Sequence, residues 1–261
     1  MTAAVGQGRG TGGDPSAASP LLGKKPREIA RMFDAIAGRY DLLNHLLSGG
    51  LDLYWRARAV GALQLTGHEV VLDLCTGTCD LALGLCRRGR ARRVVGVDFS
   101  AEMLRVGLGK VRAKREERRV PLLRGDAMRI PLADASVDAV TMAFGLRNVE
   151  VPATALAEVA RVLRPGGRIA ILEFGAPRMP VVRSLYFWYF RHVLPRIGRL
   201  VSRHRNAYTY LPASVDAFVP PEEVAAAIES QGLSAVRIVQ LSLGVVYMYA
   251  AAKLTAEPRA A

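Results

Sequence analysis

The sequence predicts a Rossmann-like α/β fold, with a mostly parallel seven-stranded sheet, helices on both faces and an antiparallel hairpin at its C-terminal end. From residue 70 onward, short runs rich in β-branched residues alternate with stretches of helical periodicity. The runs are continuously apolar, which indicates strands that are buried on both faces of a parallel sheet. The last two runs are joined by LSLG, residues 241–244, which is short enough for an antiparallel connection. With 261 residues, the chain has room for one such domain with appendages.

A tail and a helical segment precede the predicted sheet. Residues 1–25 are mostly small and polar and rich in Gly and Pro, so we expect a disordered tail. In residues 26–66, apolar side chains such as Ile29, Phe33 and Ile36 recur at helical spacing. We expect this segment to form a helical cap on the sheet, and such a cap can also cover a pocket.

The core of the predicted domain spans residues 67–177. We expect strands at residues 70–75, 93–99, 120–125, 137–144 and 168–174. We expect helices at residues 79–88, 101–116 and 152–164, the last ended by Pro165-Gly166-Gly167. An aromatic and basic insertion at residues 178–220 follows the core. A helix at 221–231 and strands at 233–241 and 245–252 then complete the sheet within residues 221–253, and residues 254–261 form a tail.

The chain is strongly basic, with a formal net charge of +13 at pH 7. Such a charge suggests an anionic partner, either nucleic acid or a membrane surface. Arginine supplies 31 of the 36 basic residues, however, and this bias favours a general coding preference over a designed patch. Two clusters keep the question open, at residues 87–93 and 110–119, and the mixed signs of the second favour a solvated helix face.

No segment has the features of a secretory signal or of a membrane-spanning helix. The first residues lack an apolar central run, and no stretch reaches the ~18 uninterrupted apolar residues of a spanning helix. We therefore expect a cytoplasmic protein.

Three cysteines, Cys75, Cys79 and Cys86, fall within one short segment. Their odd number argues against a disulfide framework in a chain without a signal. The spacing C-x3-C-x6-C matches neither a zinc pair nor the usual iron–sulfur patterns, so we expect no metal site here. We interpret these cysteines as small hydrophobic residues.

Polar or Gly-containing segments follow four of the predicted strands. They are Asp73 with Thr76-Gly77-Thr78, Asp98, Gly125-Asp126-Ala127, and Phe144-Gly145-Leu146-Arg147-Asn148. Parallel sheets bind ligands beyond the carboxyl ends of their strands, where these segments meet. Amides near Gly77 can approach a ligand closely, and Asp98 can accept both hydroxyls of a ribose. Each segment alone has a structural alternative, since Asp126 and Ser100 are also good helix caps, but their coincidence predicts a cofactor site.

The first turn helps to choose between cofactors. A nicotinamide dinucleotide site would favour G-x-G-x-x-G, whereas this turn reads T-G-T-C-D-L, with one glycine. A cofactor without a pyrophosphate needs less cradling by backbone amides. The turn therefore favours S-adenosylmethionine.

Several motifs resemble, in order and spacing, the ubiquinone/menaquinone biosynthesis C-methyltransferase family. They are FDAIAGRYDLLN, LDLYWR, VLDLCTGTCDL, GVDFSAEML, GDAMRIPLADASVDAVTMAFGLRNV, RVLRPGGRIAILEF, LPRIG and AYTYLPASV. The similarity covers roughly residues 26–253, and FGLRN and AYTYL are its most specific parts. The resemblance implies a class I methyltransferase fold, S-adenosylmethionine as methyl donor, and a reduced isoprenoid quinol as acceptor. The product would be menaquinol, or the benzoquinol equivalent in ubiquinone synthesis.

The resemblance also implies positions for the cofactor. They fall on Thr78, Asp98, Asp126-Ala127 and Ala143, and we add Asp73 and Gly77 of the first turn to the cofactor-binding residues. The chain departs from the family pattern at several positions: the turn reads Thr76-Gly77-Thr78-Cys79-Asp80 where the family commonly has G-G-T-G-D, and Ala143, Asn206 and Tyr249 also differ. Of the two cysteines in the turn, we expect Cys79 to limit the approach of the cofactor more, because its side chain replaces a glycine.

Methyl transfer to carbon needs an acceptor carbon in line with the methyl group and an adjacent hydroxyl that loses its proton. We hypothesise that Arg147 and Asn148 hold that oxygen or a water, and that Tyr40 and Asp41 close the pocket. A surface ion pair is the structural alternative for Arg147.

The acceptor carries an isoprenoid tail that resides in the bilayer. Residues 180–200 interleave aromatic and aliphatic side chains with Arg183, Arg191, Arg196 and Arg199. This segment fits the surface of an anionic membrane, such as the inner face of the cell membrane, and it fits equally well an insertion packed over the active site.

Two further classes of function are open. The net charge suggests an RNA methyltransferase, but the chain has no separate RNA-binding module, so we expect no nucleic-acid partner. Cys79, Ala143 and Tyr249 suggest a non-catalytic scaffold that has kept the fold. A homo-oligomer or a biosynthetic complex, the ring type of the acceptor and its tail length also stay open.

Overall fold

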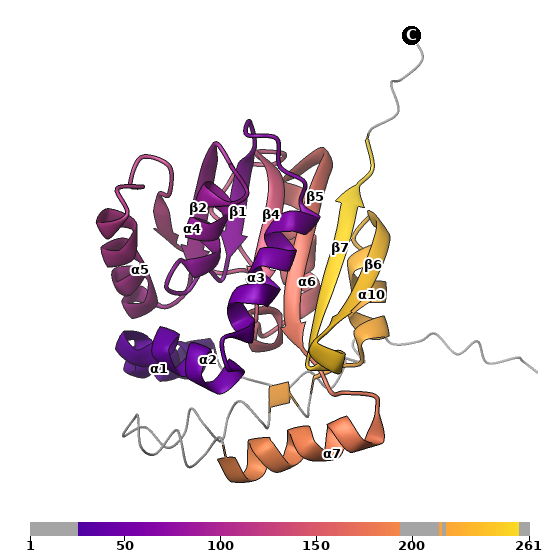
Figure 1. The fold of residues 1–261 in the computed structure, drawn as a ribbon. Helices are drawn as coiled ribbons and strands as arrows, with labels where there is room; N and C mark the ends of the chain where they lie inside the picture. Colours follow the sequence, from indigo (N-terminus) through magenta and orange to yellow (C-terminus); the bar gives the residue numbers. More distant parts are fainter. Residues whose placement is uncertain (1–25, 194–213, 216–217, 256–261) are drawn as a thin grey trace, which may run out of the picture.

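The computed structural model describes residues 26–193, 214–215 and 218–255, and its centre is one seven-stranded sheet (Figure 1). The strands lie in the order β3-β2-β1-β4-β5-β7-β6, and β7 runs antiparallel to both of its neighbours. Their bounds are β1 (Val70–Leu74), β2 (Arg93–Asp98), β3 (Leu122–Arg124), β4 (Val137–Ala143), β5 (Leu163–Phe174), β6 (Leu233–Leu241) and β7 (Val246–Lys253). The predicted fold class and the C-terminal hairpin are confirmed.

Strand β5 differs from its prediction, because it begins at Leu163 and not at residue 168. Leu163 pairs with Val137 of β4, and Arg168 pairs with Ala139, so the register shifts between these two pairs. The shift accommodates Pro165-Gly166-Gly167, which was expected to end the preceding helix and instead lies inside the strand as an irregularity.

The helices cover both faces of the sheet. Their bounds are α1 (Pro26–Ile36), α2 (Tyr40–Ser48), α3 (Leu51–Ala62), α4 (Asp80–Arg87), α5 (Ala101–Ala113), α6 (Pro152–Val162), α7 (Pro180–Trp188) and α10 (Pro221–Glu229). On β1, Val71 packs with residues of α3 and α4 in one hydrophobic cluster, and Leu72 packs with residues of α6 and α10 in another. Successive side chains of a strand point to opposite faces of the sheet. A strand that is covered by helices on both faces must therefore be continuously apolar.

Helices α1 and α2 lie across the carboxyl ends of β1 and β2, as Figure 1 shows at the lower edge of the sheet. Helix α7 packs beneath α2, where Tyr186 and Leu43 share a small hydrophobic cluster. The hydroxyl of Tyr189 also donates to the carbonyl of Leu47 at 2.9 Å. The described part of the predicted insertion is therefore joined to the helical cap.

Several predicted features lie outside the described residues, namely the N-terminal tail, the LPRIG and AYTYL motifs, Asn206, Arg196 and Arg199. Within the described ranges, every helix is too short or too polar to cross a membrane.

Candidate functional site

A cavity lies at the carboxyl ends of β1, β2 and β4, between the sheet and the helical cap. Its empty space, including the open mouth, is about 810 Å³, within the range of small-molecule sites. The strand ends contribute Cys75, Gly77, Asp98, Asp126, Ala127, Ala143, Phe144 and Asn148, and the cap contributes Ile29, Ala30, Phe33 and Tyr40. Four separate chain segments and the cap thus converge on one space, as expected for this sheet topology.

The charge of the lining is opposite to that of the whole chain. Three carboxyl groups line the cavity, those of Asp98, Asp126 and Glu150, and no Lys or Arg of the described residues does. In a chain of formal charge +13, this arrangement favours a ligand that carries positive charge. It disfavours ligands held by their phosphates, which require basic side chains or a richer set of amides.

Asp98 at the end of β2 is held in one orientation by two backbone amides. The N–H of Gly77 donates to its Oδ2 at 2.8 Å, and the N–H of Ser100 donates to its Oδ1 at 2.8 Å. Burial raises the pKa of Asp98 above its ordinary value, in spite of these hydrogen bonds. Each oxygen keeps lone pairs for further donors, so the carboxylate is placed to accept two hydroxyls of a ligand.

Asp73 holds the first turn through buried hydrogen bonds and does not line the cavity. Its carboxylate accepts hydrogen bonds from Thr76 Oγ1 at 2.6 Å and from Thr141 Oγ1 at 2.7 Å, which ties β1 to β4. Burial raises the pKa of Asp73 from 3.8 to about 6. The prediction that Asp73 contacts the cofactor has no support from this placement.

The two cysteines of the turn lie on different sides of it. Cys75 lines the cavity and packs closely on Gly145, where a Cβ would come within 2.6 Å of the Cys75 Cβ. Cys79 is fully buried against α5, where a Cβ on Gly107 would come within 2.4 Å of its sulfur. Both have positive φ, 56° and 67°, a conformation that costs a non-glycine residue ~1 kcal/mol. The expectation that Cys79 limits the approach of the cofactor is therefore wrong, and Cys75 is the cysteine beside the cavity.

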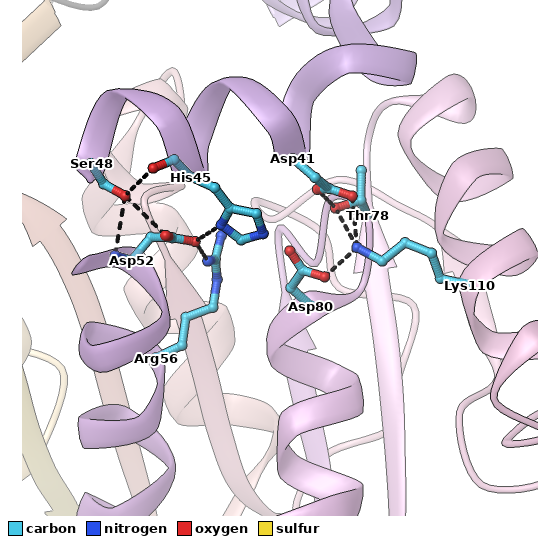
Figure 2. A network of polar contacts seen from close by, with 8 residues as sticks. All are labelled: Asp41, His45, Ser48, Asp52, Arg56, Thr78, Asp80 and Lys110. Atoms are coloured by element: carbon cyan, nitrogen blue, oxygen red, sulfur yellow. Dashed lines mark hydrogen bonds and ion pairs between the residues drawn. The ribbon is translucent and has the colours of Figure 1, made fainter. Parts of the chain in front are cut away.

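Thr78 and Asp41, each predicted at the site, contact one another outside the cavity (Figure 2). Thr78 Oγ1 donates to Asp41 Oδ1 at 2.5 Å, and Lys110 Nζ donates to Asp41 Oδ2 at 2.8 Å. Lys110 also forms an ion pair with Asp80, the first residue of α4. Figure 2 shows how Lys110 of α5 thereby connects the helical cap to the first turn and to α4.

The capping segment at α1 has a second polar link to the core. Asp34 accepts hydrogen bonds from Ser100 Oγ at 2.5 Å and from the N–H of Glu102 at 3.2 Å. Ser100 itself caps α5 as predicted, since its Oγ accepts from the N–H of Met103 at 3.1 Å. The roles of Asp34 and Lys110 were missed, because neither residue follows a strand end, although Asp34 lies in the motif FDAIAGRYDLLN.

Arg147 forms a buried ion pair behind the cavity and does not line it. Its Nη1 donates to Glu173 Oε1 at 2.6 Å and to the carbonyl of Phe144 at 2.7 Å, and its own N–H donates to Glu173 Oε2 at 3.1 Å. The side chains are 6% and 0% exposed, so the surface ion pair that we considered for Arg147 is a buried one. Glu173 was missed, although an acid at the end of the apolar run RIAILEF follows the same pattern as Asp73 and Asp98.

Tyr40 and Asn148 do line the cavity. Burial raises the pKa of the Tyr40 phenol above 10, so this group is protonated at neutral pH and donates hydrogen bonds. The Asn148 amide donates to the carbonyl of Phe144 at 3.0 Å, which orients it at the end of β4. A cluster of aromatic side chains adjoins these two residues. Phe144 stacks on Phe174 with ring centroids 4.5 Å apart, and Trp55 contacts Phe144 edge-on.

Comparison with known proteins agrees with this geometry. The model of the ubiE/COQ5 methyltransferase family matches residues 22–253. The chain belongs to this family. It is 46% identical over 218 residues to the ubiquinone/menaquinone biosynthesis C-methyltransferase UbiE of Syntrophotalea carbinolica, over 84% of this chain and 91% of that protein. It is 47% identical over 214 residues to the demethylmenaquinone methyltransferase of Thermus thermophilus, over 82% of this chain and 96% of that protein.

A solved structure supports the same fold. A SAM-dependent methyltransferase from Aquifex aeolicus superposes with a TM-score of 0.57 at 20% identity, over 88% of this chain and 100% of that one. As a member of the ubiE/COQ5 methyltransferase family, the protein is a methyltransferase whose methyl donor is S-adenosylmethionine.

The residues of the cavity fit this cofactor. The sulfonium of S-adenosylmethionine is positive, which matches a lining with three carboxyl groups and no basic side chain of the described residues. Gly77 leaves room beside the turn, since a Cβ placed on it would meet no atom within 4 Å. Of the predicted cofactor residues, Gly77, Asp98, Asp126, Ala127 and Ala143 lie together in the lining, and their contacts with the cofactor stay a prediction.

Proposed function

We propose that this protein transfers a methyl group from S-adenosylmethionine to a ring carbon of a demethylated isoprenoid quinol, which gives menaquinol or the benzoquinol equivalent. The names of the curated relatives support this acceptor. The observation that carries the proposal is the lining of one cavity, in which Asp98 and Gly77 face the same space as Tyr40, Phe144 and Asn148. A cofactor site and a site for an aromatic ring are thus continuous.

Within this cavity, the cofactor would lie against Asp98, with its ribose hydroxyls on the carboxylate and its adenine beside Asp126 and Ala127. When bound, it supplies an electrophilic methyl group on a positive sulfur. The apolar walls that include Ile29, Phe33 and Met103 exclude water from the adenine and from the methyl group.

Tyr40 and Asn148 hold the acceptor. Both are neutral hydrogen-bond donors at neutral pH, and both face the cavity. Hydrogen bonds from them to the ring oxygen stabilise the negative charge that develops there when the hydroxyl proton leaves. Since neither side chain takes up that proton, a water at the open mouth of the cavity receives it. The ring carbon then takes the methyl group while the bond from that methyl group to sulfur breaks, and S-adenosylhomocysteine is the leaving group. The ring hydrogen departs as a proton, and the ring oxygen regains a proton from water, so that the net reaction releases one proton.

Arg147 and Asp41 are positioning residues in this proposal. Arg147 holds the carbonyl of Phe144 and thereby the segment that carries Asn148. Its Nε is buried without a hydrogen bond to the described residues, so Arg147 acts on the acceptor only through the segment that it holds. Asp41 holds the cap on the first turn through Thr78 and Lys110.

The test is incubation with labelled S-adenosylmethionine and both demethylated quinols, followed by identification of the product. Asn148→Ala and Tyr40→Phe should each lower kcat by about 10-fold or more, since each removes a donor worth ~1.4 kcal/mol or more in the transition state. The Kd of S-adenosylmethionine, measured by calorimetry, should stay unchanged. Binding of the cofactor without methylation of either quinol would exclude this function. The scaffold alternative gains no support from Cys79 or Tyr249, because both are buried outside the cavity.

Peripheral contact with an anionic membrane is part of this proposal, because the tail of the acceptor resides in the bilayer. Helix α7 exposes Val181, Leu185 and Trp188, and Met179 just before the helix is also exposed; Val181 is 79% exposed. These apolar side chains lie next to the helical cap that covers the cavity, and they suit insertion at the membrane interface.

A further inference from the structure

A second hollow lies between α3, α4 and α5, on the face of the sheet that these helices cover. It shares no lining residue with the cofactor cavity, and its empty space is about 1260 Å³ with its mouth included. The groove follows α4, whose eight residues span ~12 Å.

One end of the groove carries positive charge that the described residues do not neutralise. Arg87 and Arg88 at the end of α4 and Lys114 just after α5 line the groove and are exposed. Their side chains form no ion pair or hydrogen bond among the described residues. The other two basic residues of the lining differ, since Arg56 is paired with Asp52 and Lys110 with Asp41 and Asp80 (Figure 2).

The floor of the groove is apolar, and its opposite end combines one exposed leucine with the paired charges of Arg56, Asp80 and Lys110. Val60, Leu81 and Leu83 lie along the floor, and Leu53 at the start of α3 is 51% exposed. The groove therefore has unpaired positive charge at one end, an apolar floor, and charges that are already paired beside Leu53 at the other end.

We propose that this groove holds an anionic phospholipid, with the phosphate on Arg87, Arg88 and Lys114 and the upper part of an acyl chain toward Leu53. The inference deepens the proposed function, since it rests on an acceptor that is reached at a membrane. Charge complementarity selects the headgroup, and the apolar floor distinguishes an amphiphile from free phosphate. Nucleic acid fits less well, because the described lining of the groove contains no aromatic side chain on which bases could stack.

The end of the groove that carries Leu53 is also the end nearer the membrane contact proposed for α7. The groove begins beside Asp80, which Lys110 connects to α2, and α2 packs on α7. A lipid in the groove would thus point its chains toward the apolar side chains of the cap and its phosphate away from them. This is the polarity of a lipid in a leaflet on which α7 rests.

The experiment measures binding of the full chain to vesicles by flotation, with phosphatidylcholine alone and with phosphatidylcholine mixed with phosphatidylglycerol. The triple variant Arg87→Gln, Arg88→Gln, Lys114→Gln should bind the mixed vesicles roughly 100-fold more weakly, since each basic residue near an anionic surface contributes about fivefold. The matched control Arg92→Gln, Arg93→Gln, Arg237→Gln removes the same charge from exposed positions outside the groove and should keep most of the binding.

Several results would overturn the proposal. Equal losses in both triple variants would show that net charge, and not the groove, causes binding. Inorganic phosphate alone could stabilise the wild type and not the groove variant, while neither protein binds vesicles. This result would indicate a soluble ligand. Groove-dependent binding of single-stranded RNA without vesicle binding would indicate nucleic acid. Urea unfolding of both variants checks that they fold. If the groove-dependent binding to vesicles is found but neither quinol is methylated, the proposed function would be rejected and the lipid groove would stand.

Discussion

The buried ion pair between Arg147 and Glu173 allows a quantitative test of the site, in the variant Glu173→Gln. The carboxylate accepts three hydrogen bonds, from Arg147 Nη1 at 2.6 Å, from the N–H of Arg147 at 3.1 Å and from the N–H of Phe174 at 2.9 Å. Glutamine has the same shape but one accepting oxygen. Its NH₂ group would face a backbone N–H or the guanidinium, so at least one donor would meet a donor.

The expected cost follows from the burial of the two side chains, which are 6% and 0% exposed. Removing one partner of a buried pair leaves an uncompensated charge and costs about 3–5 kcal/mol. Since a domain has roughly 5–15 kcal/mol of stability in total, the variant should lose a large part of it.

Urea unfolding, followed by circular dichroism, measures this loss. The control is Glu102→Gln, whose partner Arg105 is 72% exposed and whose ion pair is therefore worth ~0.5 kcal/mol or less. The double variant Glu173→Gln, Arg147→Met should lose less than the sum of the two single variants, because no unpaired charge is left buried. If Glu173→Gln cost no more than the control, the buried pair would not stabilise the fold and the reasoning would be refuted.

Three further predictions concern the turn and the cap. Burial raises the pKa of Asp73 to about 6, so the folded state binds this proton more tightly than the unfolded state does. The free energy of unfolding should therefore fall by up to about 3 kcal/mol as the pH rises from 4 to 7. Asp73→Asn should abolish this contribution in urea titrations at each pH. Lys110→Met breaks the links from the cap to the first turn and should weaken binding of S-adenosylmethionine about 5- to 10-fold in calorimetry, from loss of charged hydrogen bonds worth ~1–1.5 kcal/mol. Cys75→Leu places extra bulk in the cavity and should lower the affinity for S-adenosylmethionine at least ~10-fold. Cys79→Ala should leave this affinity unchanged and lower the free energy of unfolding by ~1 kcal/mol.

Each of these has a result that would count against it. A pH dependence that is the same in Asp73→Asn and in the wild type would remove Asp73 as its source. Lys110→Arg, which keeps the charge, should restore part of the affinity, and failure of both variants alike would point to a steric effect. Equal affinities for Cys75→Leu and Cys79→Ala would show that the two cysteines do not differ in their distance from the cofactor.

The sequence determined the fold class and the edge of the sheet where the site lies. Continuous apolar runs require burial on both faces, so the parallel sheet followed from hydrophobicity alone. In such a sheet the carboxyl ends of the strands meet, and this rule brought Gly77, Asp98, Asp126 and Ala143 to one cavity before any contact was known. Order along the chain was sufficient for this step, because the connection rules of α/β sheets leave few alternatives.

Only the tertiary structure decided which way the side chains at that edge point. Cys75 and Cys79 are four positions apart in one turn, yet one faces the cavity and the other the core, because positive φ at both residues redirects the chain between them. Arg147 follows a strand end like the other predicted residues, but a buried carboxylate 26 positions later draws its side chain inward. Lys110 joins three segments that are at least 30 positions away from it. Such pairings depend on the distance in space between remote segments, which local periodicity and spacing do not encode.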